Sequence, residues 1–127
     1  MKLISARRVI LNFCGFILLE IFVSGGVLAN SDSKIVNIEA QRYGYNPEAI
    51  EIPAGRAVTL HIKSLDVLHG FYIPDLNLRV DLRPGVITVV ELPALKPGKY
   101  QFLCDVFCGT GHSGMNGTLN VVGENGE

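Results

Sequence analysis

Side chains that bind soft metal ions are concentrated in one short segment, Cys104–Met115, which reads CDVFCGTGHSGM. They are two thiols, an imidazole and a thioether, from Cys104, Cys108, His112 and Met115. Thiolates and imidazoles select copper or zinc over hard cations such as magnesium, and a thioether shifts the choice toward copper. A remote imidazole is available from His69. We therefore predict a copper site formed by this segment together with His69.

The second cysteine separates this pattern from that of a mononuclear blue-copper centre, which uses one thiolate, two imidazoles and a weak axial thioether. Here two thiolates accompany the two imidazoles. That set fits two copper ions that share both sulfur atoms as bridges, with one imidazole on each ion. Val106, midway between the cysteines, would supply its backbone carbonyl oxygen as a further weak ligand.

The pattern resembles the binuclear CuA domain of cytochrome c oxidase subunit II, in the cupredoxin superfamily. The family pattern is a strand ending in D-V-x-H, a proline-glycine turn, and then C-x-x-x-C-G-x-x-H-x-x-M. Asp66–His69, Pro84-Gly85 and the Cys104–Met115 segment match these parts in order, and the match extends from about Tyr43 to Val122. The resemblance implies an all-β, cupredoxin-like Greek-key β-sandwich. It also implies the metal ligands His69, Cys104, Val106 through its oxygen, Cys108, His112 and Met115.

By resemblance, the function is one-electron transfer through two copper ions, from a c-type cytochrome toward a haem-copper oxidase subunit I. The domain would not catalyse a reaction itself. Two departures from the family are visible: Val106 stands where glutamate is common, and the chain contains no tryptophan, the residue that usually receives the electron. The His69-Gly70-Phe71 sequence is similar to that of subunits II with a single membrane span.

Other functions and metals fit parts of the same pattern. A detached periplasmic CuA carrier could serve another reductase, as in nitrous-oxide reductase, and a copper storage or delivery protein would also use soft ligands. Two cysteines and two histidines can hold zinc. Alternatively, Cys104 and Cys108 could form a disulfide in an oxidising compartment, and Met115 taken alone could be a core residue. His69 taken alone could equally be a structural histidine.

The elements expected to position these residues are short strands. Fourteen glycines and six prolines separate runs rich in β-branched residues, which is typical of a sandwich or barrel. Strands are predicted at residues 34–40, 49–52, 58–64, 71–73, 86–92, 99–104 and 118–122, and residues 43–47 are predicted to form a turn. In the strand at 58–64, Val58, Leu60 and Ile62 alternate with polar residues, so His61 is expected on the solvent face without a function. Residues 34–123 would form one domain, followed by a short tail at 124–127.

The N-terminal part reads as a separate unit. Lys2, Arg7 and Arg8 precede an apolar run, so residues 1–29 are predicted to be a cleaved secretory signal or an uncleaved anchor. Residues 9–28 are long enough to span a bilayer, although Glu20 falls among them. Both alternatives place the domain in the periplasm or on the outer face of a bacterial inner membrane.

Composition narrows the function further. The 127 residues carry a formal net charge of −1 and are 48% hydrophobic, which fits one small domain. There is no basic stripe, so nothing supports nucleic-acid binding. No nucleophile elbow, phosphate loop or paired-carboxylate pattern appears, which leaves metal binding as the chemistry that the sequence favours.

Overall fold

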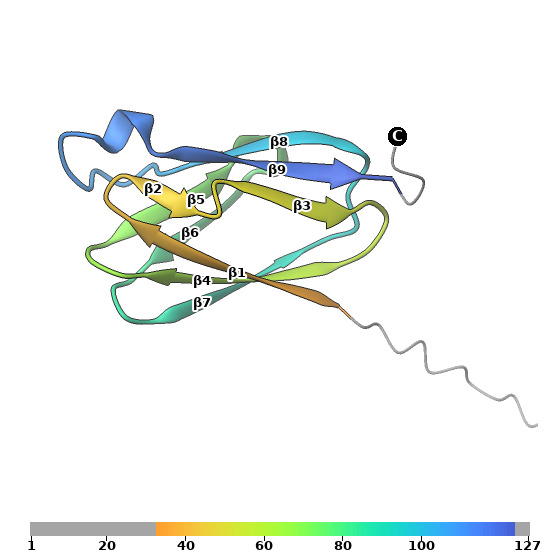
Figure 1. Cartoon of the computed structure of the whole chain (residues 1–127), viewed down its shortest axis with the longest axis horizontal. Coiled ribbons are helices and arrows are strands. Elements are labelled where there is room, and N and C mark those ends of the chain that lie inside the picture. Colours follow the sequence, from red (N-terminus) through yellow and green to blue (C-terminus); the bar gives the residue numbers. More distant parts are fainter. Residues whose placement is uncertain (1–32, 124–127) are drawn as a thin grey trace, which may run out of the picture.

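The computed structural model describes residues 33–123, which form two β-sheets packed face to face (Figure 1). The strands are β1 (Lys34–Gln41), β2 (Gly44–Asn46), β3 (Ala49–Pro53), β4 (Val58–Ser64), β5 (His69–Ile73), β6 (Leu78–Leu82), β7 (Ile87–Leu92), β8 (Gly98–Leu103) and β9 (Asn116–Val122). Two single turns of 3-10 helix accompany them, η1 (Pro74–Leu76) and η2 (His112–Gly114). The described part of the chain is therefore an all-β sandwich.

One sheet has the strand order β2-β1-β4-β7 and the other β3-β9-β8-β5-β6. Two of the pairings are parallel, β1 with β4 and β3 with β9, and the others are antiparallel. In the second sheet β8 and β9 form a hairpin in which Leu103 pairs with Asn116. The segment between those two residues emerges from one end of the sandwich, and β5 begins near the same end (Figure 1).

The core between the sheets is built from alternate residues of the strands. In β4, Val58, Leu60 and Ile62 are buried, as the alternation in the sequence predicts. His61 points to the opposite face and is half-buried. Across the core, Phe71 and Phe102 are fully buried with ring centroids 5.0 Å apart. These two rings anchor β5 and β8, the strands that lead into and out of the predicted copper site.

Most of the predicted strands are confirmed within one or two residues at each end. The prediction for residues 43–47 was wrong in part, because β2 forms there and pairs with the end of β1. β6 was not predicted at all. Its residues are mostly exposed or half-buried, so the chain lacks the alternation of apolar and polar residues that marks the other strands.

The predicted signal or anchor at residues 1–29 and the tail at 124–127 lie outside the described residues, as does the apolar run at 9–28. The domain boundaries 34–123 thus remain a prediction at both ends. Within residues 33–123, no helix has the length and apolar character needed to cross a membrane.

Candidate metal centre

The predicted ligands lie at one end of the second sheet. His69 is the first residue of β5, and Cys104 directly follows β8, which pairs with β5 through Leu103 and Tyr72. The connection from Cys104 to Met115 is closed at its base by the Cys104 amide, which donates a hydrogen bond to the Met115 carbonyl at 3.0 Å. We call residues 104–115 the ligand loop. The sheet therefore holds both ends of this loop and His69 side by side.

His69 has the geometry of a ligand that lacks its metal. Its side chain is fully buried, and Nε2 lies 2.7 Å from Oδ1 of Asp66. A carboxylate can only accept, so Nε2 of neutral His69 carries the proton and Nδ1 carries the lone pair. That Nδ1 is buried and has no hydrogen-bond partner among the described residues. A buried polar atom without a partner costs free energy, and a metal ion would satisfy it.

The two thiols face each other beside His69. Cys104 and Cys108 are both buried, and their sulfur atoms are 4.0 Å apart. A disulfide bond measures about 2.05 Å, so the two cysteines are free thiols here. One ring nitrogen of His69 and the two sulfur atoms all lie within 4.8 Å of one another. Two sulfur donors and one open nitrogen thus fit a soft metal ion.

The remaining predicted residues complete the cluster. Nδ1 of His112 and Sδ of Met115 each lie 3.8 Å from Cys108 Sγ, and the Val106 carbonyl oxygen lies 3.1 Å from Cys104 Sγ. Met115 is 1% exposed. All six residues picked out from the sequence are therefore brought together, and their role as ligands stays a prediction.

Asp66 supports the first ligand more strongly than the sequence indicates. Besides His69, it accepts hydrogen bonds from the amides of Arg42 at 2.8 Å and Val67 at 2.7 Å. Desolvation acts to raise the pKa of Asp66, but these hydrogen bonds outweigh it and lower the pKa to about 2. The group is consequently a carboxylate at every pH at which the fold is expected to persist, and it keeps His69 Nδ1 unprotonated and open.

The thiols, in contrast, lack a compensating charge. Burial raises the pKa of Cys108, and the neighbouring Cys104 raises it further. Two buried thiolates at this spacing need a cation to be stable, because like charges in a poorly solvated site repel. Metal binding here must therefore release protons from the sulfurs.

Two glycines allow the close contacts around the loop. A Cβ on Gly70 would lie 1.9 Å from Oδ1 of Asp105, so β5 and the ligand loop can approach only because Gly70 has none. Gly109 has a φ of 141°, and a Cβ there would lie 2.4 Å from the Tyr43 hydroxyl. Substitution at either position would push the loop away from its neighbours.

Sequence reasoning missed several residues that hold the site. Arg42 Nε donates to the Cys108 carbonyl at 2.8 Å, Tyr45 contacts Gly70, and Arg79 Nε donates to Asp105 Oδ2 at 2.5 Å. Arg42 and Tyr45 flank a glycine just before Pro47, which reads as a turn. No spacing rule relates them to cysteines that are far away in the sequence.

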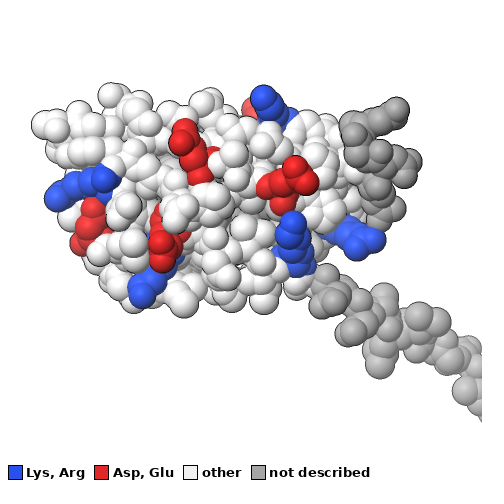
Figure 2. All heavy atoms as spheres, viewed as in Figure 1, with Lys and Arg blue, Asp and Glu red and all other residues white. Residues whose placement is uncertain are grey.

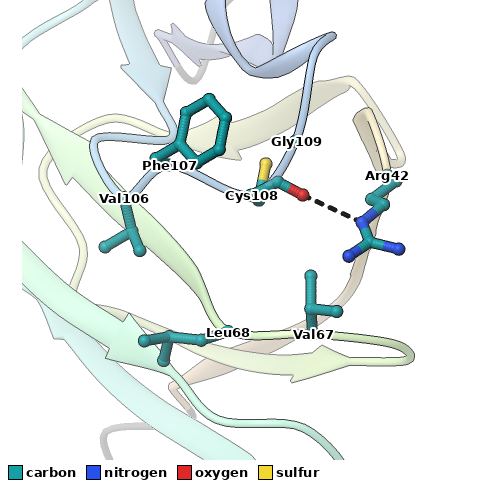
Figure 3. A pocket seen from close by; sticks show the side chains of 7 residues that line it. All are labelled: Arg42, Val67, Leu68, Val106, Phe107, Cys108 and Gly109. Carbon is teal, nitrogen blue, oxygen red and sulfur yellow. Dashed lines mark hydrogen bonds between the residues drawn. The ribbon is translucent and has the colours of Figure 1, made fainter.

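A shallow cavity of about 310 Å³ opens beside Cys108. Figure 3 shows Arg42 on one side of it, Val67 and Leu68 on another, and the Phe107 ring above the Cys108 backbone. The phenyl ring of Phe107 is 77% exposed, and its centroid lies 5.9 Å from that of His112. No Lys, Arg, Asp or Glu occurs from Val106 to Leu119, and the end of the molecule that carries η2 shows few charged side chains in Figure 2.

Comparison with known proteins gives this architecture a family. The cupredoxin-like domain matches residues 14–121, most of the chain. The chain belongs to the cupredoxin-like domain family. Copper is the metal that this family membership, together with the soft donor set, implies. The six-residue cluster is thus the candidate copper site of a cupredoxin-like domain.

The similar proteins with known names are oxidase subunits. Cytochrome c oxidase subunit 2 of Thermus thermophilus is 38% identical over 86 residues, which is 68% of this chain and 64% of the relative. The same subunit from another Thermus thermophilus strain is also 38% identical over 86 residues, but only 51% of that relative is covered. This cupredoxin-like chain therefore spans between about half and two thirds of the length of these relatives.

Solved structures give the same picture of the fold. A chain of a haem-copper terminal oxidase dimer is 30% identical with a TM-score of 0.64, covering 74% of this chain and 68% of that one. The periplasmic domain of cytochrome oxidase subunit II of Bradyrhizobium japonicum has a TM-score of 0.66 at 17% identity, covering 72% and 86%. The expected cupredoxin-like sandwich is thereby confirmed.

Proposed function

We propose that this cupredoxin-like domain is a one-electron carrier with a binuclear CuA copper centre, as or like cytochrome c oxidase subunit II. The observation that carries the proposal is the pair of buried free thiols 4.0 Å apart, with the partnerless Nδ1 of His69 beside them and His112 next to Cys108. Two sulfur atoms between two imidazoles suit two metal ions better than one. When bound, the copper pair would supply a site that gains and loses one electron.

The protein's own contribution would be to hold that site rigidly. Among the proposed ligand side chains, four are at most 5% exposed: His69, Cys104, Cys108 and Met115. The hairpin base between Cys104 and Met115 and the Asp66 contact with His69 fix both ligand segments. A site with little freedom to rearrange favours fast electron transfer. The same burial favours a resident metal over a storage or delivery role.

The exposed Phe107 marks the place where an electron would enter. Its ring contacts His112 and lies at the rim of the cavity beside Cys108, in a region without acidic residues, lysine or arginine. We propose a c-type cytochrome as the donor and a haem-copper oxidase subunit I as the acceptor, since the similar proteins are oxidase subunits. The aromatic ring would take the place of the tryptophan that this chain lacks.

We also propose that the domain, residues 34–123, works on the periplasmic side, exported by residues 1–29 or anchored through residues 9–28. The structure that resembles this chain from Bradyrhizobium japonicum is a periplasmic domain. Protease protection in spheroplasts tests the location. Digestion of the domain by protease added to intact spheroplasts is expected, and its protection would contradict an exported site.

Electron paramagnetic resonance of the copper-loaded chain tests the main proposal. Hyperfine splitting shared equally by two copper nuclei is expected, and Cys104→Ser and Cys108→Ser should each abolish it, since each removes one bridge. His61→Gln serves as the matched control, because His61 lies in β4, outside the site. Splitting by a single copper nucleus, or a two-copper signal that survives either cysteine substitution, would overturn the proposal.

A further inference from the structure

Tyr45 lies beside the candidate copper site but is not one of the proposed ligands. The side chain, on β2, is 5% exposed. Its ring meets Phe71 and Phe102 edge-on, at centroid distances of 6.0 and 5.0 Å and interplanar angles of 80° and 82°. The hydroxyl donates a hydrogen bond to the Gly70 carbonyl at 2.6 Å. The aromatic packing fixes the ring, so the hydroxyl is aimed at one backbone position.

That backbone position contacts the site directly. Gly70 follows His69, and its N–H donates a hydrogen bond to Cys104 Sγ at 3.3 Å. Gly70 is therefore held on both sides of its Cα, by Tyr45 at the carbonyl and by the sulfur at the amide. Asp105 packs so closely that a Cβ on residue 70 would clash. The orientation of the Gly70 amide toward Cys104 thus depends on contacts from β2 and from the ligand loop.

We propose that Tyr45 is a positioning residue that raises the reduction potential of the copper site by holding the Gly70 N–H on Cys104 Sγ. The inference rests on the proposed electron-transfer function. A hydrogen bond to a ligating sulfur withdraws electron density from it and stabilises the electron-rich, reduced state. One electron arrives from the donor and one leaves to the acceptor, while Tyr45 itself gives up neither an electron nor a proton.

The environment of Tyr45 keeps its hydroxyl a donor. Burial, foremost, and then the charges of Cys104 and Cys108 raise the pKa of the Tyr45 phenol far above its usual range. The hydroxyl proton therefore stays in place whatever the oxidation state of the site. A permanent donor at this position gives a constant effect on the potential, as a positioning residue should.

The substitution Tyr45→Phe removes the hydroxyl and keeps the ring. In the copper-loaded full chain, spectroelectrochemical titration should show a lower reduction potential. The loss of one hydrogen bond corresponds to a change of up to about tenfold in the ratio of oxidised to reduced protein at a fixed applied potential, and tenfold equals about 59 mV for one electron. Tyr100→Phe is the matched control, because the Tyr100 hydroxyl also donates to a backbone carbonyl, that of Lys96, outside the site. Its potential should be that of the wild type.

An unchanged potential in Tyr45→Phe would overturn the inference while leaving the two-copper proposal intact. Absence of a two-copper signal in the wild type would instead refute the proposed function. A second measurement needs only the metal-free wild-type chain: amide hydrogen exchange at Gly70 by NMR should be slow. Exchange there as fast as at an exposed amide would also overturn the inference, whether or not the variant folds.

Discussion

At the scale of single residues, Asp66 decides which nitrogen of His69 faces the metal. The carboxylate accepts from Nε2 at 2.7 Å and is itself fixed by two backbone amides. A metal-bound imidazole is commonly supported in this way, and losing such a support weakens metal binding. Asp66 therefore acts on the copper site without touching the metal.

Replacing Asp66 by alanine should weaken copper binding by about 10–100-fold, because His69 loses the partner that fixes its tautomer and ring orientation. Competition with a copper chelator of known affinity measures the effect. Asp75→Ala is the matched control, since Asp75 lies in η1, away from the ligand loop. Equal affinities of the Asp66 variant and the wild type would contradict the role assigned to Asp66.

Gly70 is the second residue on which the site depends. Gly70→Ala places a methyl group 1.9 Å from Oδ1 and 3.0 Å from the backbone nitrogen of Asp105, so the ligand loop must move. We expect a loss of about 1–3 kcal/mol in the free energy of unfolding, measured by urea denaturation. Gly44→Ala is the control, because nothing lies within 4 Å of a Cβ there. Similar losses at the two positions would show that the close approach at Gly70 is unimportant.

At the scale of elements, the ligand loop is held by side chains from strands distant in sequence. Arg42, just after β1, donates to the Cys108 carbonyl, and Arg79 of β6 pairs with both Asp81 at 2.9 Å and Asp105. The Arg79 pairs are partly exposed and contribute little to stability. The contact from Arg42 is part-buried, so it is the stronger restraint on the loop.

Arg42→Met should destabilise the metal-free protein by about 1–2 kcal/mol, since it removes a charge-assisted hydrogen bond but keeps the Arg42 amide that binds Asp66. Urea denaturation measures the change. Arg83→Met is the control, because among the described residues the Arg83 side chain makes no hydrogen bond or ion pair. A loss in the control as large as that in Arg42→Met would contradict the restraint.

The elements also explain what the sequence could and could not predict. β4 was predicted at its observed bounds because its apolar residues alternate cleanly, and the ligands were found because Cys104–Met115 is contiguous. β2 was taken for a turn since it has only three residues beside Pro47. Arg42 contacts Cys108 across 66 positions and Tyr45 contacts Gly70 across 25. Such contacts follow from sheet packing, which no local spacing encodes.

At the scale of the whole molecule, the sandwich has a core that does not need the metal. Fully buried side chains such as Leu60, Ile62 and Phe102 fill the space between the sheets. The ligands cap one end of this core. The fold should therefore persist without copper, while copper adds stability by binding only the folded state.

Removal of copper with a chelator should leave the β-sheet circular dichroism spectrum unchanged and lower the thermal midpoint. With free copper at 100 times its dissociation constant, the expected difference in stability is about 2.7 kcal/mol. Calorimetry of the metal-free and loaded chains measures it. A metal-free chain without β structure would show that the apolar core is insufficient by itself.

The parallel pairing of β3 with β9 has a consequence for timing during biosynthesis. Ala49 is in register with Thr118, so the second sheet cannot close until β9 has left the ribosome. Contacts between such distant segments form late in folding. Met115, one residue before β9, reaches its place only with that closure. A nascent chain therefore offers copper scattered donors rather than a site, and loading belongs to the finished fold.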